Sequence, residues 1–245
     1  MSASSDYRKS HIDSDKGCSY HKTFSENPYR AMIWGFERRI LDRIITEFYP
    51  AQEITHLDFA CGTGRVLKYL ANRCSLSVGV DLSPSMLEVA RSDCLGSEVI
   101  EADLTRNDIL GDREFNLVTA FRFFPNAEPE LRQQAMAVLT KHLCKDGFIV
   151  FNNHKHTGSS RNRLARLFGR RGFQGMSIPD VKELVTRNNL EVERTYHLCV
   201  FPASEKHMLL PEFALRKVEG ILARIPALCG FGENLVFVCK RAQVT

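Results

Sequence analysis

The feature that most constrains the fold is a regular alternation of short apolar runs with longer segments of helical periodicity. In the longer segments apolar residues recur every three or four positions, which is typical of amphipathic helices, whereas the short runs have the length of strands. The expected strands lie at 54–60, 76–81, 98–102, 115–121 and 147–153, and the expected helices between them at 64–73, 84–93 and 127–144. Strands and helices in turn predict an α/β fold, a parallel sheet with helices on both faces.

Less regular regions flank this core. Residues 1 to about 19 are polar and lack an apolar period, so we expect a loose arm, and from Pro28 an apolar stripe at helical spacing predicts a helix that Pro50 ends. In the last third, helices are expected at 161–168, at 178–188 and around 211–224, and strands at 191–201 and 233–240. The connection at about 202–232 is far longer than an ordinary hairpin link, so we interpret it as a lid over a site. We divide the chain into an N-terminal arm and helical cap at 1–50 and one domain at 51–245.

Composition excludes several classes of protein. The 33 Lys and Arg residues exceed the 29 Asp and Glu residues only slightly, a formal charge of +4, which indicates no nucleic-acid partner. The eight cysteines are scattered and form no C-x-x-C, so we expect reduced thiols, with neither a disulfide framework nor a zinc site. No window has the length of a bilayer-spanning apolar run, and the first residues lack a signal peptide's apolar stretch, so we expect a cytoplasmic protein with no membrane partner.

The most informative stretch is the glycine-containing turn within His56–Arg65. A strand enters a turn with Gly62 and Gly64, and acidic residues stand before the turn, Asp58, and at the end of the next strand, Asp81. Such a turn lets a ligand approach the backbone closely, and a carboxylate at the second strand end can accept both hydroxyls of a ribose. A nicotinamide dinucleotide fits less well, because Leu67 stands where its motif needs a third glycine and because Asp58 would repel a pyrophosphate. A ligand with an ammonium group suits Asp58 better.

Four segments together carry a resemblance to a known family. They are D-F-A-C-G-T-G-R at 58–65, V-G-V-D-L-S at 78–83, E-A-D-L at 101–104 and F-N-L-V-T-A-F-R-F-F-P-N at 115–126. In this order and spacing they resemble the class I, Rossmann-like methyltransferases that depend on S-adenosylmethionine, and the resemblance covers about residues 28–155. It implies a doubly wound, mostly parallel, seven-stranded sheet with an N-terminal helical cap and a C-terminal insertion lid. It also implies S-adenosyl-L-methionine as cofactor and S-adenosyl-L-homocysteine as product.

The resemblance assigns the cofactor contacts residue by residue. Asp58 and the turn would hold the methionine moiety, Asp81 the ribose, and Asp103 the adenine amino group, while Phe121 would lie near the sulfonium. The remaining residues implied at the turn and around the adenine are Ala60, Cys61, Gly62, Gly64, Leu82, Met86 and Leu104. The segment before the first motif resembles one that folds over the cofactor in small-molecule members, so Tyr20 and Tyr29 are expected to contact the sulfonium end, where a cation meets an aromatic face. For each aspartate, a helix cap or turn role is the alternative.

The acceptor side is expected at the carboxyl ends of the fourth and fifth strands, where sites in open α/β sheets lie. Methyl transfer needs alignment of donor and acceptor and, for a hydroxyl acceptor, removal of a proton. His154 is the first candidate for the base, His156 the second, and Arg122 is a further catalytic candidate; a loop histidine bonded to a carbonyl is the alternative. The pair of histidines lacks a third ligand at clear spacing, so no metal is expected.

The acceptor class is indicated by the residues just after the fourth strand. The F-R-F-F-P-N sequence lacks the Asn/Asp-Pro-Pro-aromatic motif associated with methylation of amino groups and bases, so we predict a small-molecule acceptor methylated at oxygen. If the arginine face at residues 161–171 borders the cleft, an anionic acceptor is favoured; a solvated face is the alternative. Two other functions stay open, namely a non-catalytic protein that binds S-adenosylmethionine as a scaffold and a nicotinamide-dependent oxidoreductase. The sequence does not give the oligomeric state.

Overall fold

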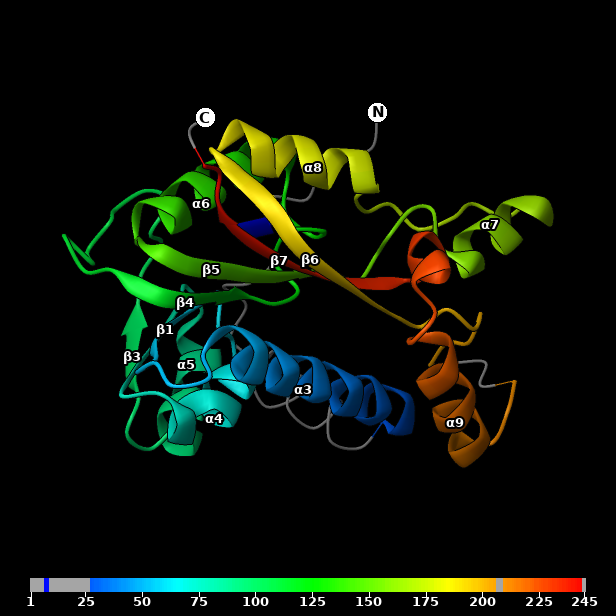
Figure 1. Cartoon of the computed structure of the whole chain (residues 1–245), viewed down its shortest axis with the longest axis horizontal. Coiled ribbons are helices and arrows are strands. Elements are labelled where there is room, and N and C mark those ends of the chain that lie inside the picture. Colours follow the sequence, from blue (N-terminus) through cyan, green and yellow to red (C-terminus); the bar gives the residue numbers. More distant parts are fainter. Residues whose placement is uncertain (1–6, 9–26, 206–208, 244–245) are drawn as a thin grey trace.

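The computed structural model describes residues 7–8, 27–205 and 209–243, and in it one mixed sheet organises the chain (Figure 1). The strands are β1 (Thr55–Phe59), β2 (Leu76–Asp81), β3 (Glu98–Glu101), β4 (Phe115–Ala120), β5 (Leu143–Asn153), β6 (Leu190–Leu198) and β7 (Asn234–Arg241). The helices are α3 (Pro28–Phe48), α4 (Arg65–Leu70), α5 (Pro84–Asp93), α6 (Pro129–Lys141), α7 (Ser160–Leu167), α8 (Ile178–Arg187) and α9 (Glu212–Leu222). Two 3-10 turns follow α4 and α9, η1 (Ala71–Arg73) and η2 (Pro226–Phe231).

The seven strands lie in the order β3-β2-β1-β4-β5-β7-β6. The first five pair in parallel, while β7 runs antiparallel to both β5 and β6. The order reverses direction between β1 and β4, and at such a switch point the loops at the carboxyl ends diverge and leave a crevice. The predicted fold class, a doubly wound and mostly parallel seven-stranded sheet, is confirmed.

Alternating side chains of the strands form two separate cores. Leu235 and Phe237 of β7 pack with α6 and α8 on one face of the sheet, whereas Val236 and Val238 pack with α3 on the other. This alternation follows from the two-residue period of a strand. Figure 1 shows α6 and α8 above the sheet and α3, α4 and α5 below it.

Helix α3 begins where the sequence supplies a cap. The Asn27 side chain accepts a hydrogen bond from the Arg30 backbone N–H at 3.1 Å, and Pro28 occupies the first helical position. The apolar stripe predicted from Pro28 onward is the buried face of this helix, and it includes one carboxylate, Glu37, that is completely buried. A buried carboxylate needs polar partners, and those of Glu37 belong to the site described below.

The predicted boundaries of helices and strands were least accurate where a strand contains polar residues or residues typical of turns. The predicted helix at 127–144 was too long, because α6 ends at Lys141 and Leu143 already pairs with Phe115 in the sheet. The Lys145–Gly147 stretch resembles a turn, but it lies within β5 beyond a register shift in its pairing with β4. The predicted strand at 191–201 ends at Leu198, because Cys199 has a left-handed φ of 58°.

The C-terminal insertion contains α9 and η2, which lie with α7 at one end of the molecule (Figure 1). Leu215 of α9 packs into the core formed with α3. Of the described residues in this insertion, 202–205 and 209–232, none lines the two cavities described below, so the predicted lid role gains no support from them. Within the described residues, no helix combines the length and the apolar character needed to cross a bilayer.

Candidate active site

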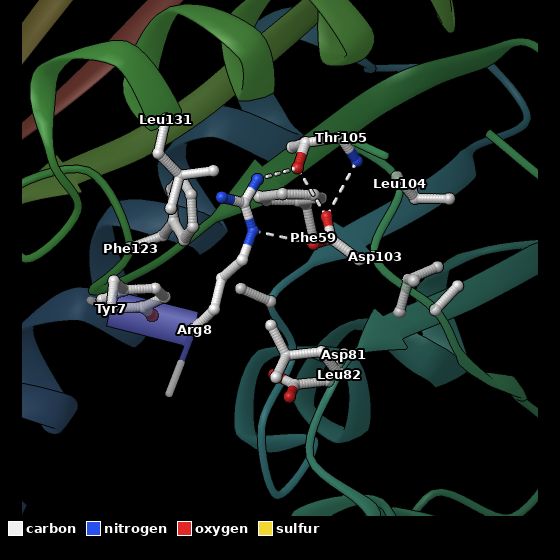
Figure 2. A pocket seen from close by; sticks show the side chains of 13 residues that line it. Tyr7, Arg8, Phe59, Asp81, Leu82, Asp103, Leu104, Thr105, Phe123 and Leu131 are labelled. Carbon is white, nitrogen blue, oxygen red and sulfur yellow. Dashed lines mark hydrogen bonds and ion pairs between the residues drawn. The ribbon is translucent and has the colours of Figure 1, made fainter. Parts of the chain in front are cut away.

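Two adjoining cavities open at the carboxyl ends of β1, β2 and β4. The larger has a volume of about 270 Å³ and the smaller about 30 Å³, and Tyr7, Ala60 and Asp81 line both. The larger cavity is also lined by Asp58, Cys61, Gly62, Thr63, Arg65, Val66, Met86, Phe121, Arg122, Asn126, His154 and Lys155. The smaller is lined by Arg8, Phe59, Val80, Leu82, Ala102, Asp103, Leu104, Thr105, Phe123 and Leu131 (Figure 2). Asp81 therefore lies where the two cavities meet. In a nucleoside ligand, the ribose occupies such a position between the base and the substituent of the sugar.

The backbone conformation of the glycine turn allows a ligand to come close to Gly62. Ala60 and Gly62 have left-handed φ values of 54° and 57°, and the Gly62 N–H donates to Asp81 Oδ2 at 2.8 Å. The Ser83 N–H donates to the other oxygen of Asp81, also at 2.8 Å. These two bonds fix the carboxylate of Asp81 toward the turn, and a carboxylate oxygen can accept more than one hydrogen bond.

Gly64 packs against α5 and is not among the cavity-lining residues, so its predicted role in cofactor binding stays a prediction. It does not line either cavity, and a Cβ added to it would lie 2.4 Å from Cys94 Sγ and 3.2 Å from Ala90 Cβ. Gly64 precedes α4 with a φ of 75°. Its missing side chain lets the start of α4 pack against the end of α5.

Asp58 ends a chain of buried hydrogen bonds. The Thr119 hydroxyl donates to Asp58 Oδ1 at 2.6 Å, and His56 links Thr119 to Ser77 through its two ring nitrogens at 2.8 and 3.0 Å. Because the single hydroxyl proton of Thr119 is used on Asp58, His56 donates from Nε2 and accepts from Ser77 at Nδ1. Burial lowers the pKa of His56 to about 3, so the ring is neutral.

The same burial makes Asp58 an unusual carboxylate. Burial raises the pKa of Asp58 to about 7, against the opposing effects of the Thr119 hydroxyl and the Leu67 backbone N–H. Its Oδ2 atom is buried and has no hydrogen-bond partner among the described residues. A buried acceptor without a donor costs free energy, and a cationic donor in the larger cavity would relieve that cost.

Asp103 lies at the far end of the smaller cavity. Its Oδ1 accepts from the Thr105 backbone N–H at 3.0 Å and from the Thr105 hydroxyl, and its Oδ2 accepts from Arg8 Nε at 2.8 Å (Figure 2). Burial alone would raise the pKa of Asp103, but the bonds from Thr105 and Arg8 outweigh it and lower the pKa. Asp103 is therefore ionised and already paired.

Arg122 is held in a strained conformation at the end of β4. Its φ is 64°, and its N–H donates to Asn152 Oδ1 at 2.6 Å. The Asn152 amide donates in turn to the buried Glu37 at 3.1 Å, and Glu37 also accepts from Asn234 at 2.9 Å. A left-handed arginine persists only where its surroundings impose it, and such strain concentrates at functional sites. The network thus fixes the backbone of Arg122 at the cavity wall.

The larger cavity also has three cationic side chains in its lining. Arg65 begins α4, Arg122 follows β4 and Lys155 follows β5, and Lys155 Nζ donates to Asn126 Oδ1 at 2.6 Å. Burial, with the nearby charges of Arg122, Lys155 and Arg65, lowers the pKa of His154 well below its usual value. Burial and Arg122 also lower the pKa of Lys155. His154 is therefore neutral, and its Nδ1 atom has no hydrogen-bond partner among the described residues.

The structure brings most of the predicted cofactor residues to these cavities. Asp58, Ala60, Cys61, Gly62, Asp81, Met86 and Phe121 line the larger one, and Leu82, Asp103 and Leu104 the smaller. Met86 was expected beside the adenine, and it lines the larger cavity but not the smaller one, which Asp103 lines. Tyr20 lies outside the described residues.

Two predicted residues are not brought to the site. The Tyr29 hydroxyl donates to the Ala203 carbonyl at 3.1 Å, and the residue is buried in the core with α3. His156 is 3% exposed and bonds through Nδ1 to the Gly232 carbonyl at 3.0 Å. Neither lines a cavity, because each polar group is used to attach the C-terminal insertion.

Sequence reasoning missed Tyr7, Arg8 and Arg65 as lining residues, and His56 and Thr119 as partners of Asp58. The period-two pattern of β1 could have placed His56 and Asp58 on one face, but nothing local in the sequence brings residues 7–8 to Asp103. Among the described residues, no group of three or more His, Cys, Asp or Glu side chains is arranged to hold a metal ion.

Comparisons with known proteins agree with this geometry. A family described as a methyltransferase domain matches residues 57–147. An uncharacterized methyltransferase of Oceanobacillus iheyensis is 23% identical over 56% of this chain and 64% of its own length. A putative methyltransferase of a Geobacillus species is 29% identical over 55% of this chain and 54% of its own length. The chain thus spans less than two thirds of the length of these relatives.

The fold has counterparts among solved structures. A magnesium protoporphyrin IX methyltransferase of Synechocystis, crystallised with bound S-adenosylhomocysteine, superimposes with a TM-score of 0.64 at 14% identity, covering 97% of this chain and 100% of the other. At this identity the likeness shows the fold, and the match at residues 57–147 shows the type of domain. Residues 57–147, which include Asp58, Asp81 and Asp103, therefore match a methyltransferase domain, and the chain has the fold of a solved methyltransferase.

Proposed function

We propose that this protein transfers a methyl group from S-adenosylmethionine to an oxygen of a small, anionic acceptor in the cytoplasm. The observation that carries the proposal is the presence of both charges in the larger cavity. Asp58 and Asp81 lie beside the glycine turn, and Arg122 and Lys155 follow β4 and β5. Arg65 also lines this cavity at the start of α4, but it pairs with the buried Glu37 at 3.5 Å. A cationic donor and an anionic acceptor would each find complementary charge.

The described residues fit the cofactor. The buried Oδ2 of Asp58 lacks a donor that an ammonium group would supply, and Asp81 stands between the two cavities, where its carboxylate oxygens can accept from ribose hydroxyls. Leu82 and Leu104 provide apolar walls for a base, and Phe121 lies on the methionine side. When bound, the cofactor supplies a methyl group on a positively charged sulfur; the protein has to hold and align the reactants.

The charges near the acceptor position favour an oxygen that arrives as an anion. Arg122 and Lys155 would lower the pKa of a hydroxyl or pair with a carboxylate. His154 carries a depressed pKa, so it is a weak proton acceptor and serves better as a neutral hydrogen-bond partner at Nδ1. The catalytic contribution we propose is therefore binding and orientation by Arg122 and Lys155, with His154 beside them.

The cofactor part is tested by calorimetry with S-adenosylhomocysteine. We expect binding to the parent protein, loss of most affinity in Asp81→Ala, and no change in Asp93→Ala, whose half-buried carboxylate pairs with Lys68 at 3.0 Å and does not line either cavity. The absence of heat with the parent protein would refute the proposal.

The acceptor part is tested by incubating the protein with methyl-labelled S-adenosylmethionine and fractionated small metabolites. We expect label in the anionic fraction as an ester or ether, and a KM for that acceptor that rises about tenfold or more in Lys155→Ala but not in the exposed Lys145→Ala. Label on nitrogen would contradict the oxygen assignment. Binding without transfer to any fraction would favour a non-catalytic scaffold.

A further inference from the structure

Arg8 occupies the mouth of the smaller cavity. Its Nε donates to Asp103 Oδ2 at 2.8 Å, and its Nη2 donates to Thr105 Oγ1 at 2.7 Å and to Gln134 Oε1 at 3.3 Å (Figure 2). Both members of the ion pair are mostly enclosed, with side chains 19% and 23% exposed. The guanidinium is thus bound by three acceptors, and the strongest of these is the carboxylate expected to hold the adenine amino group.

The neighbouring Tyr7 fixes the chain at this position. Its ring packs edge-on against Phe123 with centroids 5.2 Å apart, and its backbone N–H donates to Glu128 Oε1 at 2.8 Å. Tyr7 is 9% exposed and belongs to the core shared with α6. Arg8 is therefore presented to Asp103 by an anchored residue.

With Arg8 in place, the smaller cavity cannot accept a purine. Its volume of about 30 Å³ has room for no more than a few water molecules, whereas the adjoining cavity offers about 270 Å³. The walls otherwise suit a base, since Leu82, Leu104 and Val80 are apolar and Asp103 is the polar group at the end. The side chain of Arg8 lies in this lining and is bonded to the carboxylate that a base would have to reach.

We propose that Arg8 is an intramolecular competitor of the cofactor, whose guanidinium holds Asp103 until the adenine displaces it. This inference rests on the proposed function, since it assumes that the adenosine end binds in the smaller cavity. The adenine amino group is a neutral donor, and it replaces a charged one at Asp103. Breaking the ion pair therefore reduces the apparent affinity for cofactor.

Competition of this kind has an electrostatic signature. Salt weakens a partly exposed ion pair, so high ionic strength should release Arg8 and strengthen cofactor binding by the parent protein. In a variant without the Arg8 guanidinium, salt should not strengthen cofactor binding in this way. A residue that only supported the fold would not produce a salt-dependent difference in affinity.

The experiment is calorimetry with S-adenosylhomocysteine on the full chain, comparing the parent with Arg8→Ala and Arg106→Ala. Arg106 is the matched control, because its Nε lies 3.7 Å from the same Asp103 oxygen, its side chain is 70% exposed and it does not line the cavity. We expect Arg8→Ala to bind about three- to tenfold more tightly than the parent at low salt. At high salt, the Kd of Arg8→Ala should approach that of the parent. The Kd of Arg106→Ala should equal that of the parent at each salt concentration.

The possible results separate the inference from the proposed function. Weaker or unchanged binding by Arg8→Ala, while the parent still binds, would overturn the competition and leave the cofactor assignment intact. If neither the parent nor Arg8→Ala binds S-adenosylhomocysteine at any salt concentration, the proposed function itself is refuted. Thermal melts of each variant without ligand exclude misfolding as the cause, and Arg8→Lys, which keeps the charge, should stay close to the parent.

Discussion

At the residue scale, the burial of Asp58 costs stability, and the role that we propose for Asp58 is to bind the ammonium group of the cofactor. It is 2% exposed, one oxygen is bound by Thr119, and the other has no hydrogen-bond partner among the described residues. A protein selected for stability alone would not keep a carboxyl group here. Ser77, His56 and Thr119 are neutral and are linked by hydrogen bonds, and the Thr119 hydroxyl orients the carboxyl group of Asp58.

We expect Asp58→Asn to be more stable than the parent at alkaline pH and unable to bind cofactor well. The folded pKa of about 7 lies above the ordinary value of 3.8, so the folded state holds more protons than the unfolded state between these values. The contribution of this group to stability therefore falls as pH rises from about 4 to 7, by up to about 4 kcal/mol, and stays low above that range. Denaturant melts of both proteins at several pH values measure the difference.

The same protonation governs binding, because an ammonium group needs the ionised carboxylate. In the parent, the Kd for S-adenosylhomocysteine should rise about tenfold between pH 8 and pH 6, and in Asp58→Asn it should be weak at both pH values. Calorimetry at the two pH values decides this. A pH-independent Kd in the parent would show that Asp58 does not contact the ligand.

At the scale of secondary-structure elements, the site depends on how closely α4 and α5 approach β2. Gly64 lets the start of α4 approach Cys94, the residue after α5. Gly79 in β2 lets Leu67 of α4 approach the sheet, since a Cβ at Gly79 would lie 2.6 Å from Leu67 Cδ2. A dinucleotide motif obtains this approach from a third glycine on the helix. Here the small residue is on the strand instead, which explains how Leu67 is accommodated.

Gly64→Ala should destabilise the protein by about 2–4 kcal/mol, because the new Cβ meets Cys94 and the backbone is left-handed. Gly62→Ala should cost only about 1 kcal/mol, since its Cβ would lie 3.4 Å from Met86 Sδ, an ordinary contact, and only the φ is unfavourable. Adding Cys94→Ala should recover part of the loss in Gly64→Ala and none of that in Gly62→Ala. Thermal or urea unfolding of the two glycine variants, of Cys94→Ala and of the two double variants tests this, and strict additivity for Gly64→Ala with Cys94→Ala would contradict the proposed contact.

The limits of sequence reasoning lie at the same scale. Helix α5 matched its predicted range because Ser83 and Pro84 mark its start locally, whereas the beginning of β5 depends on the pairing of Leu143 with Phe115. Asp58 and Asp81 were found because strand-end acids beside a glycine turn are a local pattern. Arg8 was missed because its contacts with Asp103 and Gln134 span 95 and 126 positions of the chain. The division at residue 50 between a cap and a domain stays a prediction, and α3 shares a core with the sheet.

At the scale of the whole molecule, the cavity walls come from elements spread along most of the sheet's parallel half. Residues of β1 and β2 and of the loops after β3, β4 and β5 line the two cavities, and their alignment requires the folded sheet. A ligand that binds this arrangement and not the unfolded chain must stabilise the entire domain by mass action. Stability is therefore a measure of occupancy that needs no knowledge of the acceptor.

S-adenosylhomocysteine at about one hundred times its Kd should add about 2.7 kcal/mol to the free energy of unfolding. For a chain of this size that corresponds to a rise in Tm of about 5–10 °C. Asp81→Ala should fold but show little of the rise, because the Gly62 and Ser83 N–H groups lose their shared acceptor and the ribose loses its carboxylate. NAD should produce no rise in the parent, since Asp58 opposes a pyrophosphate beside the turn. Scanning calorimetry with each ligand makes the comparison, and a rise with NAD alone would favour the oxidoreductase over the methyltransferase.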